Sequence, residues 1–163
     1  MNYFELFGIP SAPTVDRSSL AKRYFELQRE NHPDFFTQAT MEEKDEALKQ
    51  SADINKAFKI FQDREMTLEY FLLSVAILEQ EEKYNLPQDF LMEMMEINES
   101  LADEGDSITR EKLTEYLDSL LADVTPVLDN YNKETTSQTD LLRLKDYHYK
   151  KKYLNRILDR LGD

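Results

Sequence analysis

Apolar side chains recur at helical spacing through the first half of the chain. Leu20, Tyr24 and Leu27 follow one another at steps of four and three residues, which places them on one face of a helix. A second long helix is expected over residues 41–61, and its apolar positions are Ala47, Ile54, Ala57, Phe58 and Phe61. Because these positions can face the first stripe, the pattern predicts an antiparallel pair of amphipathic helices.

Two shorter helical segments complete this half. Residues 3–7 form an aromatic-rich turn of helix that Gly8 and Pro10 bring to an end. A fourth helix is predicted from Arg64 to about Leu78, with an apolar face made of Met66, Tyr70, Leu73 and Ile77.

Three further apolar stripes follow in the second half. Pro87 suits the first turn of a helix, and the helix expected over residues 90–104 has a stripe made of Phe90, Met94, Ile97 and Leu101. Thr109 can cap the next helix, whose stripe is Leu113, Leu117, Leu120, Val124, Val127 and Tyr131. The stripe of the last helix is Leu144, Tyr147, Leu154, Leu158 and Leu161. Three such stripes predict a three-helix bundle.

The polar run from Glu79 to Lys83 separates the two sets of stripes. We therefore expect an all-α, L-shaped protein in which residues 1–76 form one domain and residues 84–163 form a three-helix bundle. Residues 77–83 would connect the two. At 163 residues, the chain is long enough for two small domains of this kind.

Composition narrows the possible functions. The chain contains no Cys, so disulfides, thiolate metal sites and cysteine nucleophiles are excluded. Its two histidines, His32 and His148, lie on separate segments without metal-ligand spacing, and there is no glycine-rich phosphate loop. We therefore expect no metal, no cofactor and no enzymatic activity. The first residues do not read as a targeting peptide, and no stretch reaches the roughly 18 apolar residues of a membrane span, so we expect a cytoplasmic protein without a membrane partner.

The net charge of −13 argues against a nucleic-acid partner. Its distribution is uneven, because residues 17–30 carry a net charge of +2, residues 79–118 carry −10 and residues 143–160 carry +5. In one interpretation, the acidic and basic helices pack as neighbours in one bundle. In the other, the small basic surface of residues 17–30 is a docking surface for an acidic protein.

The tripeptide His32-Pro33-Asp34 lies between the first two long helices, and we call it the proline bend. Proline fixes its own φ and disfavours helical geometry in the residue before it. His32 should therefore end the helix, and the proline bend should be exposed. Together with the basic residues before it and the segment Ile54-Asn55-Lys56-Ala57-Phe58 after it, this arrangement resembles a J-domain.

A more specific resemblance is to the HscB family of iron–sulfur cluster co-chaperones. It rests on the opening Tyr3-Phe4-Glu5-Leu6-Phe7-Gly8-Ile9-Pro10 and on the later Glu69-Tyr70-Phe71-Leu72-Leu73. It covers residues 1 to about 75, and the C-terminal extension of the family fits the remainder. The chain departs from the family pattern at Phe35, where many J-domains carry Lys, and at Thr67, where bacterial relatives often carry Arg.

The resemblance implies a co-chaperone. Its J-domain would stimulate ATP hydrolysis by an HscA/DnaK-class chaperone, and its C-terminal bundle would hold an IscU-type iron–sulfur scaffold protein. The implied chaperone-binding residues are His32, Pro33, Asp34, Lys22, Arg23 and Arg29. The three basic side chains, expected on the solvent side of their helix, would steer an acidic partner, while the Asp34 carboxylate would pair with a guanidinium group.

A second candidate site lies on the helix expected over residues 90–104. Leu91, Met92 and Met95 lie off its core stripe and are flanked by the carboxylates of Glu96, Glu99 and Asp103. We call these six residues the methionine patch. Either a third helix covers its apolar members, or the patch is exposed and binds protein, in which case the family resemblance supplies the scaffold as the partner. Tyr153 is a further candidate, either as an aromatic scaffold contact or as a half-buried core residue.

The sequence leaves one alternative co-chaperone function open. A J-domain protein serving a different client would bind that client through the same methionine patch. A purely structural or dimerising bundle is disfavoured, because dimerisation requires neither the proline bend nor its basic flank.

Overall fold

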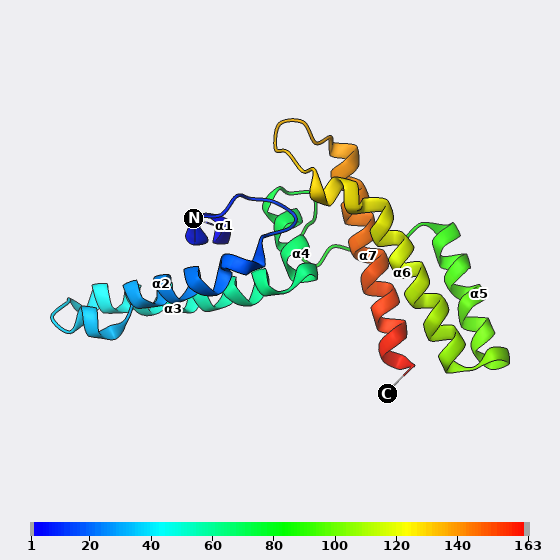
Figure 1. Ribbon diagram of the computed structural model, residues 1–163, viewed down its shortest axis with the longest axis horizontal. Coiled ribbons are helices and arrows are strands. Elements are labelled where there is room, and N and C mark those ends of the chain that lie inside the picture. Colours follow the sequence, from blue (N-terminus) through cyan, green and yellow to red (C-terminus); the bar gives the residue numbers. More distant parts are fainter. Residues whose placement is uncertain (1, 162–163) are drawn as a thin grey trace. The chain divides into compact units, whose positions relative to one another are not determined.

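The computed structural model describes residues 2–161, except for the side chains of Pro33, Leu101 and Ala102. Within this part of the chain all regular structure is helical and no strand is present, so the prediction of an all-α fold is confirmed. The chain divides into two compact units, Met1–Val75 and Ala76–Asp163 (Figure 1). That these units are separate domains with the expected boundaries stays a prediction.

The first unit is built on a pair of long helices. α2 (Leu20–Glu30) packs along α3 (Met41–Gln62), as the apolar stripes predict (Figure 1). α3 begins with a capping box, in which the Thr40 hydroxyl accepts from the Glu43 N–H and the Thr40 N–H donates to the Glu43 carboxylate. The remaining helices are α1 (Tyr3–Phe7) and α4 (Arg64–Ser74), with 3-10 turns η1 (Arg17–Ser19) and η2 (Pro33–Phe36).

Aromatic rings from three helices form the core of this unit. The ring of Phe4 on α1 packs 5.1 Å from that of Phe61 on α3, and Phe7 meets the same ring edge-on at 5.5 Å. Tyr70 on α4 joins them at 5.4 Å from Phe4. Each such pair adds about 0.5–1.5 kcal/mol beyond the burial of its area. The short α1 is therefore held in place by this cluster, since one turn of helix is not stable alone.

The buried face of α4 differs from the predicted one. Its buried residues are Thr67, Leu68, Phe71 and Leu72. The predicted positions are exposed or half-buried, and the last of them lies beyond the helix: Met66, Tyr70, Leu73 and Ile77. The segment is apolar on both sides, so its periodicity does not select a face. Thr67 can be buried because its hydroxyl lies 2.9 and 2.8 Å from the carbonyl oxygens of Ile60 and Asp63.

The second unit is a three-helix bundle. Its helices are α5 (Gln88–Glu104), α6 (Asp106–Asp129) and α7 (Gln138–Arg160), and α6 packs against both of the others (Figure 1). The centre of the bundle is formed by Phe90, Met94, Leu113 and Leu154. Of the stripe predicted on α5, Ile97 is half-buried against this centre, and the side chain of Leu101 lies outside the described residues.

α6 begins earlier than expected. Gly105 adopts a φ of 89° immediately before it, and the helix starts at Asp106. Thr109 is therefore not the cap but a buried residue of the first turn, whose hydroxyl donates to the Gly105 carbonyl at 3.0 Å. Pro126 lies in the last turn of α6, where its missing N–H affects only the end of the helix, and α6 continues to Asp129.

The segment that precedes α5 is attached to α7. The Tyr84 hydroxyl donates to the Asp146 carboxylate at 2.7 Å, and the Tyr84 ring stacks on Tyr149 with centroids 4.5 Å apart. Two residues earlier, Glu82 pairs with Lys145 at 2.7 Å. Residues 77–83, expected as a connecting segment, are accordingly grouped with the second unit.

Candidate functional site

The proline bend follows the end of α2. The last residue of the helix is Glu30, and the side-chain amide of Asn31 donates back to the Leu27 carbonyl at 2.9 Å. His32 is extended, with φ −66° and ψ 138°, as a residue before proline should be. It caps η2, which begins at Pro33. The helix thus ends two residues before His32, which instead starts the next turn, while the side chain of Pro33 lies outside the described residues.

The side chains of His32 and Asp34 are both exposed and are held next to each other. The His32 Nδ1 atom accepts from the Asp34 backbone N–H at 3.2 Å, and the Asp34 Oδ2 atom lies 3.5 Å from the same nitrogen. With Nδ1 as the acceptor, the neutral ring carries its proton on Nε2. The Asp34 carboxylate is 86% exposed, so the bend presents an N–H donor and an anionic acceptor to a partner.

The three basic residues of α2 do not share one environment. Lys22 and Arg29 are exposed, as expected. The Arg23 side chain is only 36% exposed, because its Nε donates to the Phe7 carbonyl at 3.2 Å and its Nη1 lies 3.4 Å from the Glu26 carboxylate. Arg23 thus lies on the solvent side of α2 as expected, but its guanidinium also joins α2 to the end of α1.

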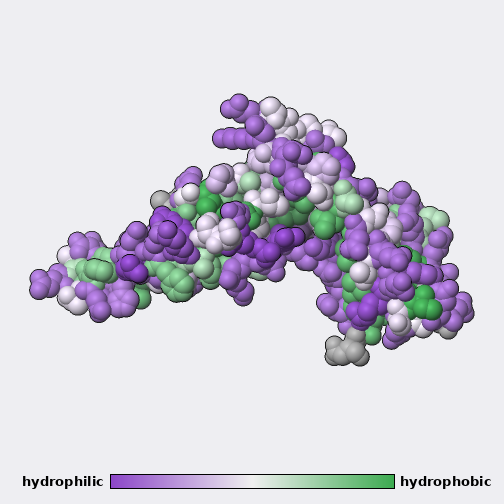
Figure 2. All heavy atoms as spheres, in the orientation of Figure 1, coloured by the Kyte–Doolittle hydropathy of each residue, from purple (hydrophilic) through white to green (hydrophobic). Residues whose placement is uncertain are grey.

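The structure adds exposed aromatic residues that the sequence analysis did not assign to the site. Phe25 and Phe35 are both largely exposed, and Phe25 lines an open hollow between α2 and α3 together with Gln28, Arg29, Asn31, His32 and Ser51. Figure 2 shows hydrophobic atoms among hydrophilic ones at this end of the helix pair. Phe25 directly follows Tyr24 and so lies off the buried stripe. An aromatic residue at such a position could have been predicted from the sequence to be exposed.

The methionine patch on α5 is exposed in most of its members. Met92 and Met95 are 57% and 61% exposed, and the side chains of Glu96, Glu99 and Asp103 also face solvent. In the part of the bundle that the structure describes, no helix covers these two methionines. Leu91 differs from the prediction, because it is half-buried against the centre of the bundle. Leu91 directly follows Phe90 and lies at the edge of the core. Its angular distance from the core stripe on the helix did not predict this.

Tyr153 lies at the border between the core and the surface. It is half-buried on α7, and its ring meets that of Phe90 edge-on with centroids 5.7 Å apart. The same ring of Phe90 lies 5.9 Å from Tyr116 on α6. Tyr153 therefore packs as a core residue, and the part of its surface that remains exposed can still contact a partner.

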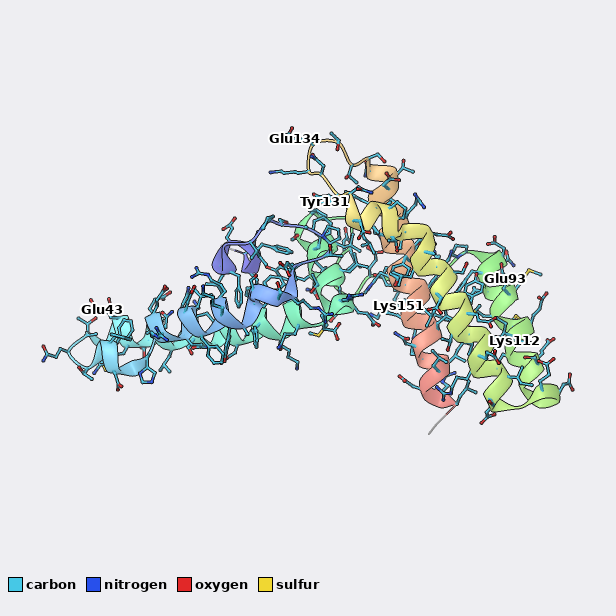
Figure 3. All side chains as sticks on the ribbon, viewed as in Figure 1. Glu43, Glu93, Lys112, Tyr131, Glu134 and Lys151 are labelled. Carbon is cyan, nitrogen blue, oxygen red and sulfur yellow. The ribbon has the colours of Figure 1, made fainter. Side chains whose placement is uncertain are left out.

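Acidic groups surround the methionine patch. Glu93 projects from α5 (Figure 3), and burial together with a hydrogen bond to Glu93 raises the pKa of Tyr116 to about 12. Near the end of α5, Glu104 is paired with Lys112 of α6 at 2.6 Å, so the acidic character comes from Glu93 and from the carboxylates of the patch itself. The apolar members of the patch therefore lie in a strongly acidic surrounding, which favours a partner with basic residues around an apolar centre.

Other kinds of site have no support in the described part of the chain. Among residues 2–161, no three His, Asp or Glu side chains come together in a way that could hold a metal ion. None of the helices in that range has the length and apolar character needed to cross a membrane.

Comparisons with known proteins agree with this geometry. The family described as "HSCB C-terminal oligomerisation domain" matches residues 86–162. A co-chaperone protein HscB homolog of Shewanella woodyi is 30% identical over 100% of this chain and 98% of its own. Another from Shewanella baltica is 33% identical over 99% of this chain and 95% of its own.

Two solved structures are similar along nearly the whole chain. The chaperone HscB from Vibrio cholerae has a TM-score of 0.70 and 30% identity, over 99% of this chain and 95% of its own. The crystal structure of the human co-chaperone protein HscB has a TM-score of 0.75 and 28% identity, over 99% of this chain and 80% of its own.

Proposed function

The chain belongs to the HscB family of co-chaperones, and we propose that it stimulates ATP hydrolysis by an HscA/DnaK-class chaperone and brings an IscU-type iron–sulfur scaffold protein to that chaperone. In this proposal it acts in the cytoplasm, has no enzymatic activity of its own and assists the maturation of iron–sulfur clusters.

The observation that carries the chaperone part of the proposal is the geometry of the proline bend. His32 and Asp34 are held side by side at an exposed helix end by a hydrogen bond within the bend itself. The hydrogen bond orients the His32 ring, and the exposed Asp34 carboxylate beside it can pair with a guanidinium group. Lys22 and Arg29 on the neighbouring helix add exposed positive charge, which speeds association with an acidic surface.

The methionine patch supports the scaffold part of the proposal. Met92 and Met95 leave apolar surface exposed on α5, whereas Phe90 and Met94 of the same helix are buried at the centre of the bundle. Methionine side chains adapt to the shape of a partner, and the flanking carboxylates of Glu96, Glu99 and Asp103 restrict which partners can approach. A chain that binds scaffold and chaperone together raises the effective concentration of one for the other.

Single-turnover ATP hydrolysis by the chaperone tests both parts of the proposal. The full chain should accelerate hydrolysis, and the chain together with the scaffold should accelerate it more than either protein does alone. The His32→Gln variant is the matched control for the first effect. No acceleration by the wild-type chain would refute the chaperone role, whereas acceleration that the scaffold does not change would indicate a different client.

A further inference from the structure

Methionine is the main oxidisable residue of this chain. The sequence contains six methionines but no Cys and no Trp. Peroxides that react with protein sulfur can therefore act only on thioether groups here. The rate of such a reaction depends on access to the sulfur atom, so the burial of each methionine decides which ones react.

Three methionines lie within one turn of α5 and differ sharply in exposure. Met92 and Met95 are 57% and 61% exposed, whereas Met94, between them, is 1% exposed at the centre of the bundle. Two other exposed methionines, Met41 and Met66, lie on α3 and α4 of the first unit. α5 thus holds two reactive positions and an unreactive internal standard in four consecutive residues.

We propose that Met92 and Met95 form a reversible oxidation site, through which peroxide controls the binding of the scaffold; this inference rests on the proposed function of the methionine patch. The peroxide transfers one oxygen atom to the thioether sulfur. An S–O bond forms, the O–O bond breaks and water leaves, so the sulfur is oxidised by two electrons and the peroxide is reduced. A methionine sulfoxide reductase, which uses thiol electrons, reverses the step.

The location of the two sulfurs explains why their oxidation would weaken binding. A sulfoxide is polar and chiral, whereas the thioether is apolar and adaptable. A partner that buries the patch would have to remove water from each new S=O group without supplying a hydrogen bond in return. The sulfoxide oxygens would also add negative charge density close to Glu96 and Glu99, which are exposed beside them.

The experiment uses the full chain and hydrogen peroxide, removed with catalase before the scaffold is added. Peptide mass spectrometry follows each sulfoxide, and calorimetry measures the Kd for the scaffold. We expect Met92 and Met95 to react at least about tenfold faster than Met94, and the Kd to rise about tenfold or more. Treatment with sulfoxide reductases should restore the original Kd.

Three variants assign the effect to these sulfurs. Whatever Kd the Met92→Leu/Met95→Leu variant has before treatment, peroxide should leave that Kd unchanged. The Met41→Leu/Met66→Leu variant removes the two exposed sulfurs among the described residues of the first unit and should remain sensitive. A Met92→Gln/Met95→Gln variant, which is polar without any oxidant, should bind weakly while its thermal melt stays unchanged.

The contrary outcomes distinguish failure of the oxidation site from failure of the proposed scaffold binding. If Met94 reacts as fast as its neighbours, or if the oxidised chain binds with an unchanged Kd, the oxidation site is refuted while the proposed function stands. The same holds if the Met92→Leu/Met95→Leu variant loses binding on oxidation. If the untreated chain does not bind the scaffold, the proposed scaffold binding is refuted, and with it the control of that binding by oxidation.

Discussion

The Nδ1 atom of His32 accepts a hydrogen bond from the backbone N–H of Asp34, 3.2 Å away. The ring is therefore oriented by the backbone of the proline bend to which His32 itself belongs. This local arrangement separates the role of His32 in binding from any role in folding.

We predict that His32→Gln abolishes stimulation of the chaperone ATPase and leaves the fold intact. The residue is exposed at a helix end, where a substitution typically changes the free energy of unfolding by no more than about 0.5 kcal/mol. Single-turnover ATP hydrolysis and a thermal melt of the same preparation measure the two effects. A variant that stimulates fully, or one that melts many degrees lower, would mean that His32 is only structural.

Arg29→Ala and Arg23→Ala should behave differently. Arg29 is exposed, so its loss should slow association with the chaperone and weaken the salt dependence of the rate, because surface charges act mainly on association. Arg23→Ala should in addition lower stability by about 1 kcal/mol, since it removes the hydrogen bond to the Phe7 carbonyl. Stopped-flow association at two salt concentrations and a denaturant titration distinguish the two, with Lys49→Ala on α3 as a control for charge. An equal loss of stability in both arginine variants would contradict the structural difference.

The double variant Met92→Ala/Met95→Ala should keep its melting temperature and lose scaffold binding. Both side chains are largely exposed, whereas truncating an interface anchor commonly costs more than about 1–2 kcal/mol of binding free energy. Leu91→Ala is the comparison, because its half-buried side chain packs on the core and its loss should lower the melting temperature as well. Calorimetry with the scaffold and thermal melts provide the measurements. A double variant with normal scaffold binding would move the search to Tyr153.

The chain should lose stability at high pH through two tyrosines. Burial raises the pKa of Tyr116 to about 12 and that of Tyr84 further still, from an ordinary value near 10. Because the pKa is raised in the folded state, each tyrosine contributes to the free energy of unfolding. This contribution is fully present below pH 10 and is lost as the pH rises through about 12. Tyr116→Phe should therefore flatten this part of the stability profile, and Tyr84→Phe/Tyr116→Phe should flatten it further. Denaturant unfolding at several pH values tests this, and a profile that both variants leave unchanged would contradict it.

Gly8 and Ala76 each follow a helix and have a positive φ, and substitutions at the two positions should change the stability of the protein in opposite directions. Gly8 ends α1 with a φ of 64°, and Ala76 follows the cap of α4 with a φ of 59°. Ala at Gly8 should cost about 1 kcal/mol of stability. Glycine at position 76 removes the cost of a left-handed backbone at a residue with a side chain, although it also gives the unfolded chain more conformational freedom. The first effect is the larger, and Ala76→Gly should raise the free energy of unfolding by up to about 1 kcal/mol. Chemical denaturation of both variants is the test, and a strongly destabilised Ala76→Gly variant would show that its methyl group is needed for packing.

The sequence predicted those features that depend on spacing along one helix. The core stripes of α2 and α3 recur at helical spacing, and proline restricts the residue before it, which is His32 here. α4 was assigned the wrong face because its segment is apolar on two sides, and the buried side is the one that contains Thr67, Leu68 and Phe71.

The candidate site was less predictable for the same reason. Whether Arg23 is exposed depends on the Phe7 carbonyl sixteen residues away, and the burial of Leu91 depends on α6 and α7. Contacts between residues distant in sequence decide these positions, and helical periodicity carries no information about them.

The attachment of Tyr84 to Asp146 has a consequence for biosynthesis. The two residues are 62 positions apart, and Glu82 is joined to Lys145 across a similar distance. A ribosome adds about 5–20 residues per second, so the segment before α5 leaves the tunnel several seconds before its partners exist. The nascent chain must carry this segment unattached until α7 has been made. A chain truncated before α7 would therefore lose structure at the beginning of the second unit as well as at its end.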